Sequence, residues 1–494
     1  MLSRTLIIVL LSITFICQGQ DYGSLRKIEK EQLQLDFELL KQGLEKHHSG
    51  LYRYTPKDSV DMALSNGLKR IQLDMNEIEF FKIASPIVSL TREDHTDIKF
   101  STETVKFLNT EASYLPFKVV FLDQKMYITE EYSQNVLGIV GLEIVEINGK
   151  TPIELVRILG KHFASDGFIK PVKFADLEGF QFAYHYFIEH GFLESINVKY
   201  LDSNNVVIEL DAKPIKRPAI IQNLRNRIQG KAPVTKTPNE NLEFEILNDS
   251  VAYLAVHTFS NDDYRENKIN KNYKAFLEKS FRTINEKNIR NLVIDVSQNT
   301  GGSEGNENLL YSYIGKNYQK YNSVCAKSQS SVLDNGVDKP IKLKTFGFFE
   351  RIFYNSKMSD GSYCRKENIG FGLMAYKKEP INKYSGKVYV IISPTTYSGG
   401  SEFSNMMRAN NLATFVGEET GGGFYGNTSG YSSKLELPHS NLKVYIPTLK
   451  FDMNVSGTPI GRGVIPDFKV IPSIADYLSN ENVPLKFILN NTAN

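Results

Sequence analysis

The sequence contains no tryptophan, only three cysteines and no long run of charge of one sign. So few cysteines exclude a small scaffold held together by disulfides. Lys and Arg total 58 and Asp and Glu total 56, a net charge of +2, which does not favour a nucleic-acid-binding face. With 26 tyrosines and 30 phenylalanines, aromatic packing does not depend on tryptophan. The 494 residues, 41% hydrophobic and 23% charged, have the composition of a soluble globular protein, and ~100–200 residues per domain predicts several domains.

The only long apolar stretch lies at the N-terminus, where residues 1–20 predict a signal peptide. Arg4 precedes an apolar segment that ends at Cys17 and is shorter than the ~20 residues of a membrane-spanning helix. Cleavage near Gly19 would leave a secreted or periplasmic protein with no membrane span. An uncleaved anchor is the less favoured alternative, and bulky Ile16 disfavours lipid attachment at Cys17.

Metal-binding signals are also missing. The chain has no CxxC motif, no Cys/His cluster and no HExxH among its eight histidines, so no metal or other cofactor is expected. Cys325 and Cys364 would remain after signal removal, and an oxidising compartment would permit them to pair. The sequence does not show whether they meet.

Hydrophobic periodicity divides the rest of the chain. Helical spacing predicts helices over about 24–48, 59–73 and 77–90, and alternation predicts a hairpin over 117–132. Residues 138–159 predict two strands, an Asn-Gly turn at Asn148 and Gly149, and a helix. Short apolar strands then alternate with helices, including one over 264–286, as in an α/β domain. The expected division is a signal peptide (1–20), a helical domain (21–104), a β-rich module with an insertion (105–215), a linker (216–241), an α/β core (242–476) and a C-terminal tail (477–494).

One loop of the core has the composition of an acyl-transfer site. The sequence TTYSGGSEF places Ser398 between a buried strand and a helix, followed by Gly399 and Gly400. Glycines at a helix start leave backbone N–H groups free to meet a developing oxyanion beside a nucleophile. An N-capping serine on a glycine-rich loop is the simpler interpretation. The GxSxG elbow does not match, because Thr396 stands at its first glycine.

Two further loops could complete such a site. The segment IDVSQNTGG ends a predicted strand with Gly301 and Gly302, which permit close backbone approach and could supply a second oxyanion donor. No phosphate-binding loop pattern fits these glycines. The segment REDHTD contains His95, and histidine is the commonest base for a serine nucleophile near neutral pH.

Taken in this order, the motifs DHT, IDVSQNTGG, TYSGGSEF with VGEETGG, and IGRGVIPD resemble the tail-specific, or C-terminal-processing, serine peptidases, including their tricorn-protease-like branch. The resemblance spans about residues 30–475. It implies an α/β fold with a ββα-spiral core of the crotonase and Clp-protease kind, and GLEIVEING suggests a PDZ-like module over 105–215. It also implies hydrolysis of unfolded or C-terminal polypeptide segments through an acyl-enzyme.

The resemblance assigns Ser398 as nucleophile and the backbone of Gly399, with Gly301 or Gly302, as oxyanion hole. One branch of the family takes its base from a lysine, but Gly423 stands in that place here; the other uses a histidine, which His95 matches.

The acid that would orient this base is not identified by the motifs. The position before the Gly-Val-x-Pro-Asp signature, where the tricorn-like branch carries its acid, holds Ile460 and Gly461. Asp94, Glu418 and Glu419 are therefore the candidates.

Three functions follow. The first is an exported serine peptidase that acts on polypeptides, with the PDZ-like module binding a chain end as an added strand. The second is an inactive peptide- or ligand-binding protein of the same fold, and the third is another acyl hydrolase such as an esterase.

Overall fold

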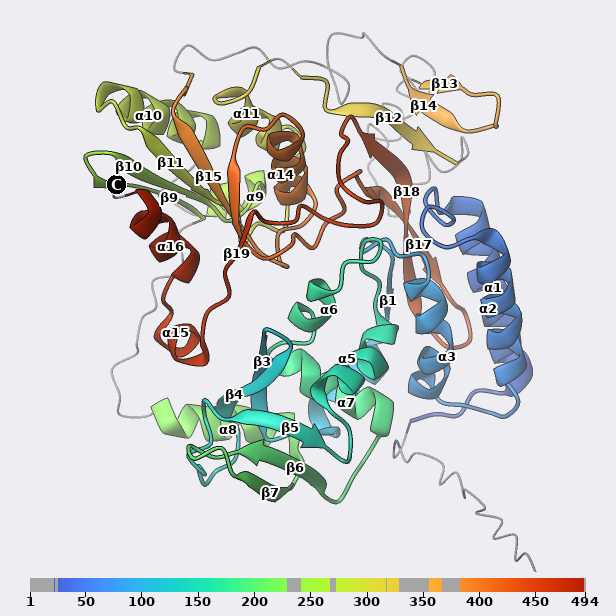
Figure 1. The fold of residues 1–494 in the computed structure, drawn as a ribbon. Coiled ribbons are helices and arrows are strands. Elements are labelled where there is room, and N and C mark those ends of the chain that lie inside the picture. The colour runs from blue at the N-terminus through green and yellow to red at the C-terminus, as the bar shows by residue number, and fades with distance from the viewer. Residues whose placement is uncertain are drawn as a thin grey trace, which may run out of the picture.

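The computed structural model describes residues 22, 25–228, 241–266, 272–316, 318–327, 355–366 and 383–492. It is a mixed α/β structure, with an α/β core, a β-rich module below it and a helical region beside them (Figure 1). Within the described ranges, no helix combines the length and the hydrophobicity needed to cross a membrane. The expected signal peptide and its alternatives at Cys17 lie outside the described residues.

The core is a six-stranded sheet in the order β19-β16-β15-β11-β10-β9. All neighbours are parallel except β9 and β10. Its strands are β9 (Leu242–Asn248), β10 (Val251–Val256), β11 (Asn291–Asp295), β15 (Lys387–Ile392), β16 (Thr414–Gly417) and β19 (Phe468–Lys469). The interiors of the central strands are apolar and both of their faces are buried, as is usual in parallel sheets.

Helices cover both faces of this sheet. Alternate strand residues such as Leu254 and Ile294 pack with α10 (Tyr273–Glu286), α11 (Asn306–Ser312) and α14 (Gly399–Ala409). The residues between them pack against Ile488 of α16 (Val483–Thr492), within the segment expected to be a tail. The helix expected over 264–286 is α10 together with a separate α9 (Asn261–Glu266), and residues 267–271 lie outside the described chain.

The helical region comprises α1 (Lys30–His47), α2 (Lys57–Arg70) and α3 (Glu77–Ser89), close to the predicted helices. It packs on a hairpin of the C-terminal half, β17 (Thr428–Glu436) and β18 (Lys443–Met453), as Figure 1 shows. The short strand β1 (Asp97–Lys99) joins this hairpin by pairing with β18. The buried Asp36 carboxylate accepts hydrogen bonds from the N–H groups of His439 and Ser440. The segment that carries His95 is therefore held against the C-terminal half.

The same sheet continues from β18 to β12 (Tyr321–Ala326), β14 (Tyr363–Arg365) and β13 (Asn355–Lys357). Cys325 and Cys364 face each other in register and form a disulfide. The pairing that the sequence left open is thus made.

The β-rich module is a five-stranded antiparallel sheet in the order β3-β4-β5-β6-β7. Its strands and main helices are β3 (Phe117–Leu122), β4 (Lys125–Glu131), β5 (Glu143–Ile147), β6 (Ile196–Leu201), β7 (Val207–Ala212), α5 (Pro152–Leu159) and α7 (Phe180–His190). The Asn-Gly turn is present, with φ of 46° at Asn148 and 75° at Gly149. Within residues 138–159, β5 is the single strand before this turn. Gly138 and Gly141 take φ of 75° and 88°, which an extended strand does not allow. The PDZ-like assignment stays a prediction.

Shorter elements connect these parts: α4 (Thr102–Thr110), β2 (Ser113–Tyr114), η1 (Gly160–His162), α6 (Pro171–Ala175), β8 (Ile215–Lys216), α8 (Arg217–Ile228) and α15 (Ile474–Ser479). Helix α8 occupies the first half of the expected linker; Pro218 stands in its first turn, where no helical N–H is needed. The helical region and the β-rich module share one hydrophobic cluster, so the expected division into domains remains a prediction.

Candidate active site

Ser398 lies on a sharp turn between β15 and α14. Its backbone has φ 45° and ψ −121°, a conformation that is costly for a residue with a Cβ atom and that recurs at nucleophiles displayed on strand-to-helix turns. Although Ser398 stands at the N-cap of α14, its hydroxyl makes no capping hydrogen bond. The simpler interpretation, an N-capping serine, therefore does not describe this residue.

The loop after β11 lies directly against this serine. A Cβ atom added to Gly301 would meet Ser398 Cβ at 2.6 Å and Oγ at 3.0 Å, and Gly301 takes φ of 106°. The buried Asn299 shapes this loop: its amide donates to the Val256 carbonyl and its Oδ1 accepts the N–H of Gly301. Its carbonyl also accepts the N–H of Tyr397. Asn299 thus connects the glycine loop to the serine turn.

These hydrogen bonds show which of the three expected oxyanion donors, the N–H groups of Gly301, Gly302 and Gly399, are already used within the protein. The N–H of Gly301 is used by Asn299. Among the residues that the structure describes, the N–H groups of Gly302 and Gly399 have no hydrogen-bond acceptor. They are the two donors of the expected set that remain free for an oxyanion.

His95 lies on the loop between α3 and β1. It is half-buried, and its Nδ1 atom has no hydrogen-bond partner. No hydrogen bond joins it to Ser398 or to a carboxylate in the described part of the chain. The residues that precede them in the two loops lie near each other, since burial and then the charge of Asp94 raise the pKa of Tyr397. Catalytic contacts are often loose before substrate binds.

A buried aspartate that the motifs did not indicate connects the histidine loop to the core. Asp166 Oδ1 accepts the N–H of Asp94 at 2.9 Å, and its Oδ2 accepts the N–H of Gly423 at 2.9 Å. The glycine loop that contains Gly423 in turn bonds the serine turn, since the Gly422 N–H donates to the Thr396 carbonyl. Asp166 therefore fixes both loops to each other.

The three candidate orienting acids have different surroundings. Burial, followed by the nearby charges of Asp166 and Asp176, raises the pKa of Asp94 well above its ordinary value. Glu418 lines a cavity, and burial raises its pKa. Glu419 forms an ion pair with Arg462, whose Nε and Nη2 donate to the carboxylate at 2.7 and 2.6 Å. None of the three is bonded to His95, so the orienting acid stays unassigned.

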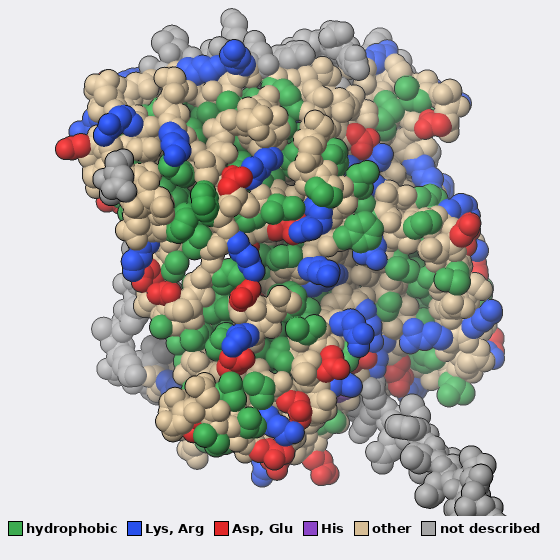
Figure 2. Space-filling model, in the orientation of Figure 1, with side chains coloured by type: hydrophobic (Ala, Val, Ile, Leu, Met, Phe, Trp, Pro, Cys, Tyr) green, Lys and Arg blue, Asp and Glu red, His purple; other side chains and the backbone are tan. Residues whose placement is uncertain are grey.

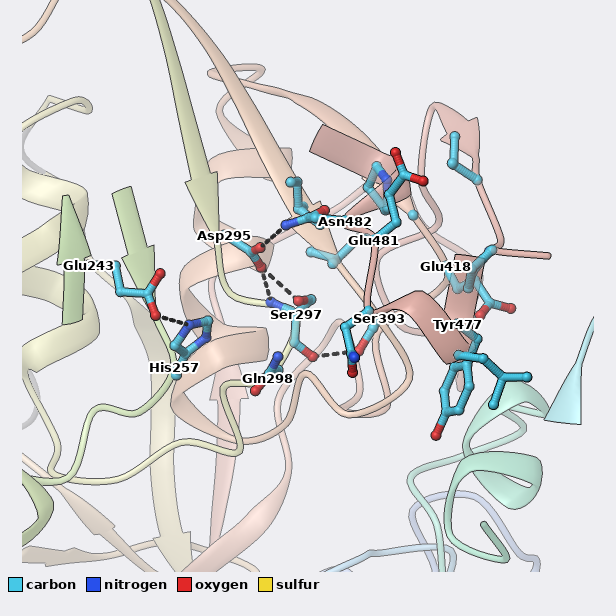
Figure 3. Close-up of a pocket in the computed structure, with 18 of the residues that line it drawn as sticks. Glu243, His257, Asp295, Ser297, Gln298, Ser393, Glu418, Tyr477, Glu481 and Asn482 are labelled. Carbon is cyan, nitrogen blue, oxygen red and sulfur yellow. Dashed lines mark hydrogen bonds and ion pairs between the residues drawn. The ribbon is translucent and has the colours of Figure 1, made fainter. Parts of the chain in front are cut away.

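Two cavities lie at the carboxyl edge of the core sheet, between it and the β-rich module. One has a volume of about 1100 Å³ and the other about 740 Å³, and both are lined by Ser393 and Glu418. In the larger one, Asp295 accepts hydrogen bonds from Ser297 and Asn482, and His257 faces Glu243 (Figure 3). Ser398 does not line either of them. On the face drawn in Figure 2, positive and negative side chains are interspersed, in keeping with the small net charge.

Three carboxylates near α14 have the spacing of a metal site: Glu304, Glu307 and Glu402. The ammonium group of Lys320 lies among them, within 2.8 Å of each. The position that a cation would take is thus filled by a side chain of the protein.

Comparison with known proteins identifies this site's family. Residues 250–470, which include both glycine loops, Ser398 and the VIPD segment, match the model of peptidase family S41. The match covers 221 of the 494 residues and identifies this region as a serine-type peptidase domain of family S41. No curated protein sequence matches it.

Solved structures show the same fold over nearly the whole chain. Mature CPAF bound to lactacystin aligns with a TM-score of 0.63 at 15% identity, covering 94% of this chain and 99% of that one. Mature CPAF alone aligns with a TM-score of 0.62 at 15% identity and the same coverage. A serine-to-alanine variant of CPAF gives 0.61 at 14% identity, with 93% and 98% covered. The α/β peptidase fold expected from the motifs is confirmed; at these identities the likeness establishes the fold alone.

Proposed function

We propose that the chain is an exported serine peptidase that hydrolyses unfolded or C-terminal polypeptide segments through an acyl-enzyme on Ser398. The observation that carries this proposal is the strained turn that presents Ser398 without a capping bond, near backbone N–H groups of Gly302 and Gly399 that have no acceptor among the described residues. Strain of this kind at one side chain is a recurrent feature of displayed nucleophiles.

In the proposed reaction, Ser398 Oγ attacks the scissile carbonyl carbon while His95 takes the hydroxyl proton. The carbonyl oxygen becomes an oxyanion that the N–H groups of Gly302 and Gly399 stabilise. His95 then gives its proton to the departing amine as the C–N bond breaks. Water, activated by the same histidine, hydrolyses the resulting ester and restores the serine.

An exported location is supported by the disulfide between Cys325 and Cys364, since such bonds persist in oxidising compartments. The near-neutral surface suits a substrate that is held by its backbone.

The proposal is tested by following the hydrolysis of an unfolded, fluorescently labelled casein. We expect cleavage by the wild type, loss of cleavage in Ser398→Ala, and a large reduction in His95→Ala. Ser401→Ala is a matched control on the same turn, because Ser401 donates its hydroxyl to the Thr396 carbonyl and is not assigned to the chemistry. Equal rates in the wild type and Ser398→Ala would reject this serine as nucleophile.

An inactive binding protein is the alternative, and the absence of an acid bonded to His95 in the described residues favours it. That function predicts that the wild type binds the casein and leaves it intact. An esterase would cleave a p-nitrophenyl ester but no peptide bond.

A further inference from the structure

A buried ionic cluster lies beside α14, the helix that begins directly after Ser398. The Lys320 side chain is 2% exposed, and its Nζ lies 2.6 Å from Glu307 and 2.5 Å from Glu402. A third carboxylate, Glu304, lies 2.8 Å away and is partly exposed. The three protons of the ammonium group thus have three carboxylate acceptors.

The cluster connects the elements that build the oxyanion hole. Glu304 and Glu307 follow the glycine loop of Gly301 and Gly302, and both oxygens of Glu307 accept the N–H of Gly305. Glu402 belongs to the first turn of α14, the helix that begins at Gly399. Lys320, immediately before β12, is therefore ion-paired on one side with the segment that directly follows the glycine loop and on the other side with α14.

The cluster also lies close to the site itself. Glu307 Oε2 is 3.9 Å from the position that a Cβ atom on Gly399 would occupy. The Tyr321 hydroxyl lies 3.0 Å from a Glu402 oxygen and 3.1 Å from a Glu304 oxygen and donates to these carboxylates. Burial raises the pKa of Glu307 to about 7. The groups that face Glu307 are therefore Lys320, Glu304, Glu402, Tyr321 and, from α10, Tyr273.

A contribution to folding stability does not by itself explain why the buried ion pairs of Lys320 are present. A buried ion pair costs desolvation free energy, and apolar residues of similar size are often at least as stabilising. A cluster that joins two loops at a fixed separation has a different use, because oxyanion donors act only when they are preorganised. In addition, uncompensated carboxylates at this distance would oppose negative charge in the oxyanion hole.

We propose that Lys320 is a positioning residue. Ion-paired with Glu304, Glu307 and Glu402, it holds the Gly301–Gly302 loop and the start of α14 at the separation that the oxyanion requires. Its positive charge also balances the negative charge of these carboxylates near the oxyanion hole. This inference rests on the proposed function of Ser398. Lys320 touches no reacting atom in this account.

The test replaces the ammonium group with an apolar side chain of similar length, Lys320→Met, and measures casein hydrolysis well below the melting temperature of the variant. We expect kcat to fall at least ~10-fold with little change in KM, because oxyanion stabilisation acts on the transition state. The rate of covalent labelling by a fluorophosphonate, in which a Ser Oγ–P bond forms and fluoride leaves, should fall in parallel. Lys199→Met, which removes a surface lysine paired with Glu146, is the matched control and should retain wild-type values.

Two further readouts separate positioning from simple structural support. In Lys320→Met the ratio of variant to wild-type kcat should decrease as the pH rises, because the uncompensated carboxyls ionise. Adding Glu307→Gln and Glu402→Gln, which keep the side-chain shapes and remove the surplus charge, should abolish this pH dependence but leave kcat low, because the ion pairs that hold the two segments together are still missing. Lowered thermal stability with unchanged kcat and an unchanged pH profile would overturn the inference.

The two proposals fail in different ways. If Ser398→Ala retains activity, or if the wild type is neither active nor labelled by the fluorophosphonate, the proposed function is rejected and the inference with it. If Ser398→Ala is inactive while Lys320→Met has wild-type kcat, only the role of Lys320 is rejected.

Discussion

Replacing Asp166 with asparagine tests whether the histidine loop is held in place by this one side chain. Asp166 is 1% exposed and accepts two backbone hydrogen bonds, one from Asp94 and one from Gly423. In Asp166→Asn one carboxylate oxygen becomes an NH₂ group, which then faces an N–H donor. The variant therefore loses one bond to a charged acceptor and leaves one buried N–H group unsatisfied.

The magnitude follows from these two losses. A hydrogen bond to a charged group contributes ~1.5–3 kcal/mol, and an unsatisfied buried donor costs ~1–3 kcal/mol. Relief of repulsion with Asp94 and Glu93, whose pKa values are raised first by burial and in part by the Asp166 charge, offsets some of this cost. We expect the unfolding free energy to fall by about 3 kcal/mol, which corresponds to an ~100-fold larger equilibrium constant for opening at one tenfold step per 1.4 kcal/mol.

The assay is hydrogen exchange at the Asp94 and Gly423 amides, combined with urea denaturation and casein hydrolysis. Both amides should exchange faster, and kcat should fall because the loop that carries His95, the proposed base, is no longer held to the Gly423 loop. Glu111→Gln, which breaks an exposed ion pair with Lys216, is the control and should change none of these quantities. Unchanged exchange at both amides together with wild-type kcat would refute the reasoning.

Three other predictions concern pH, the glycine loop and the disulfide. Burial raises the pKa of Glu93 from 4.5 to about 8, so between these pH values the folded state binds more protons than the unfolded chain. The unfolding free energy therefore decreases as the pH rises from about 4.5 to 8. Glu93→Gln should flatten this pH dependence in urea titrations, and an unaltered slope would contradict the prediction. Asn299→Ala removes the acceptor of the Gly301 N–H and should lower kcat with little effect on KM, whereas wild-type kcat would exclude this role. Reduction of Cys325–Cys364, which are separated by 39 residues, should lower the unfolding free energy by up to about 4 kcal/mol in a denaturation series with and without dithiothreitol; equal midpoints would contradict this.

The sequence predicted those features that depend on short stretches of chain. The buried strand before Ser398, the Asn-Gly turn at Asn148 and the three N-terminal helices all have local signals, and the structure confirms them. Local signals also failed where conformation depends on a few backbone angles: the positive φ of Gly138 and Gly141 ends what alternation suggested was a strand.

Contacts made across the chain were not predictable in the same way. Asp166 bonds residues that are 72 and 257 positions away, and nothing in the segment ASDGF distinguishes it from a loop aspartate. Lys320 reads as an ordinary polar residue before a strand until folding brings three glutamates to it. Family motifs find residues that take part in chemistry, whereas these side chains position them, and their role becomes visible only in three dimensions.

The central claim, that Ser398 is the nucleophile, is tested most directly by labelling the folded protein with a fluorophosphonate and locating the adduct by mass spectrometry. The account predicts a single adduct on the peptide that contains Ser398, absent in Ser398→Ala and formed more slowly in His95→Ala. An adduct on another serine, or none on a protein that still cleaves casein, would contradict it.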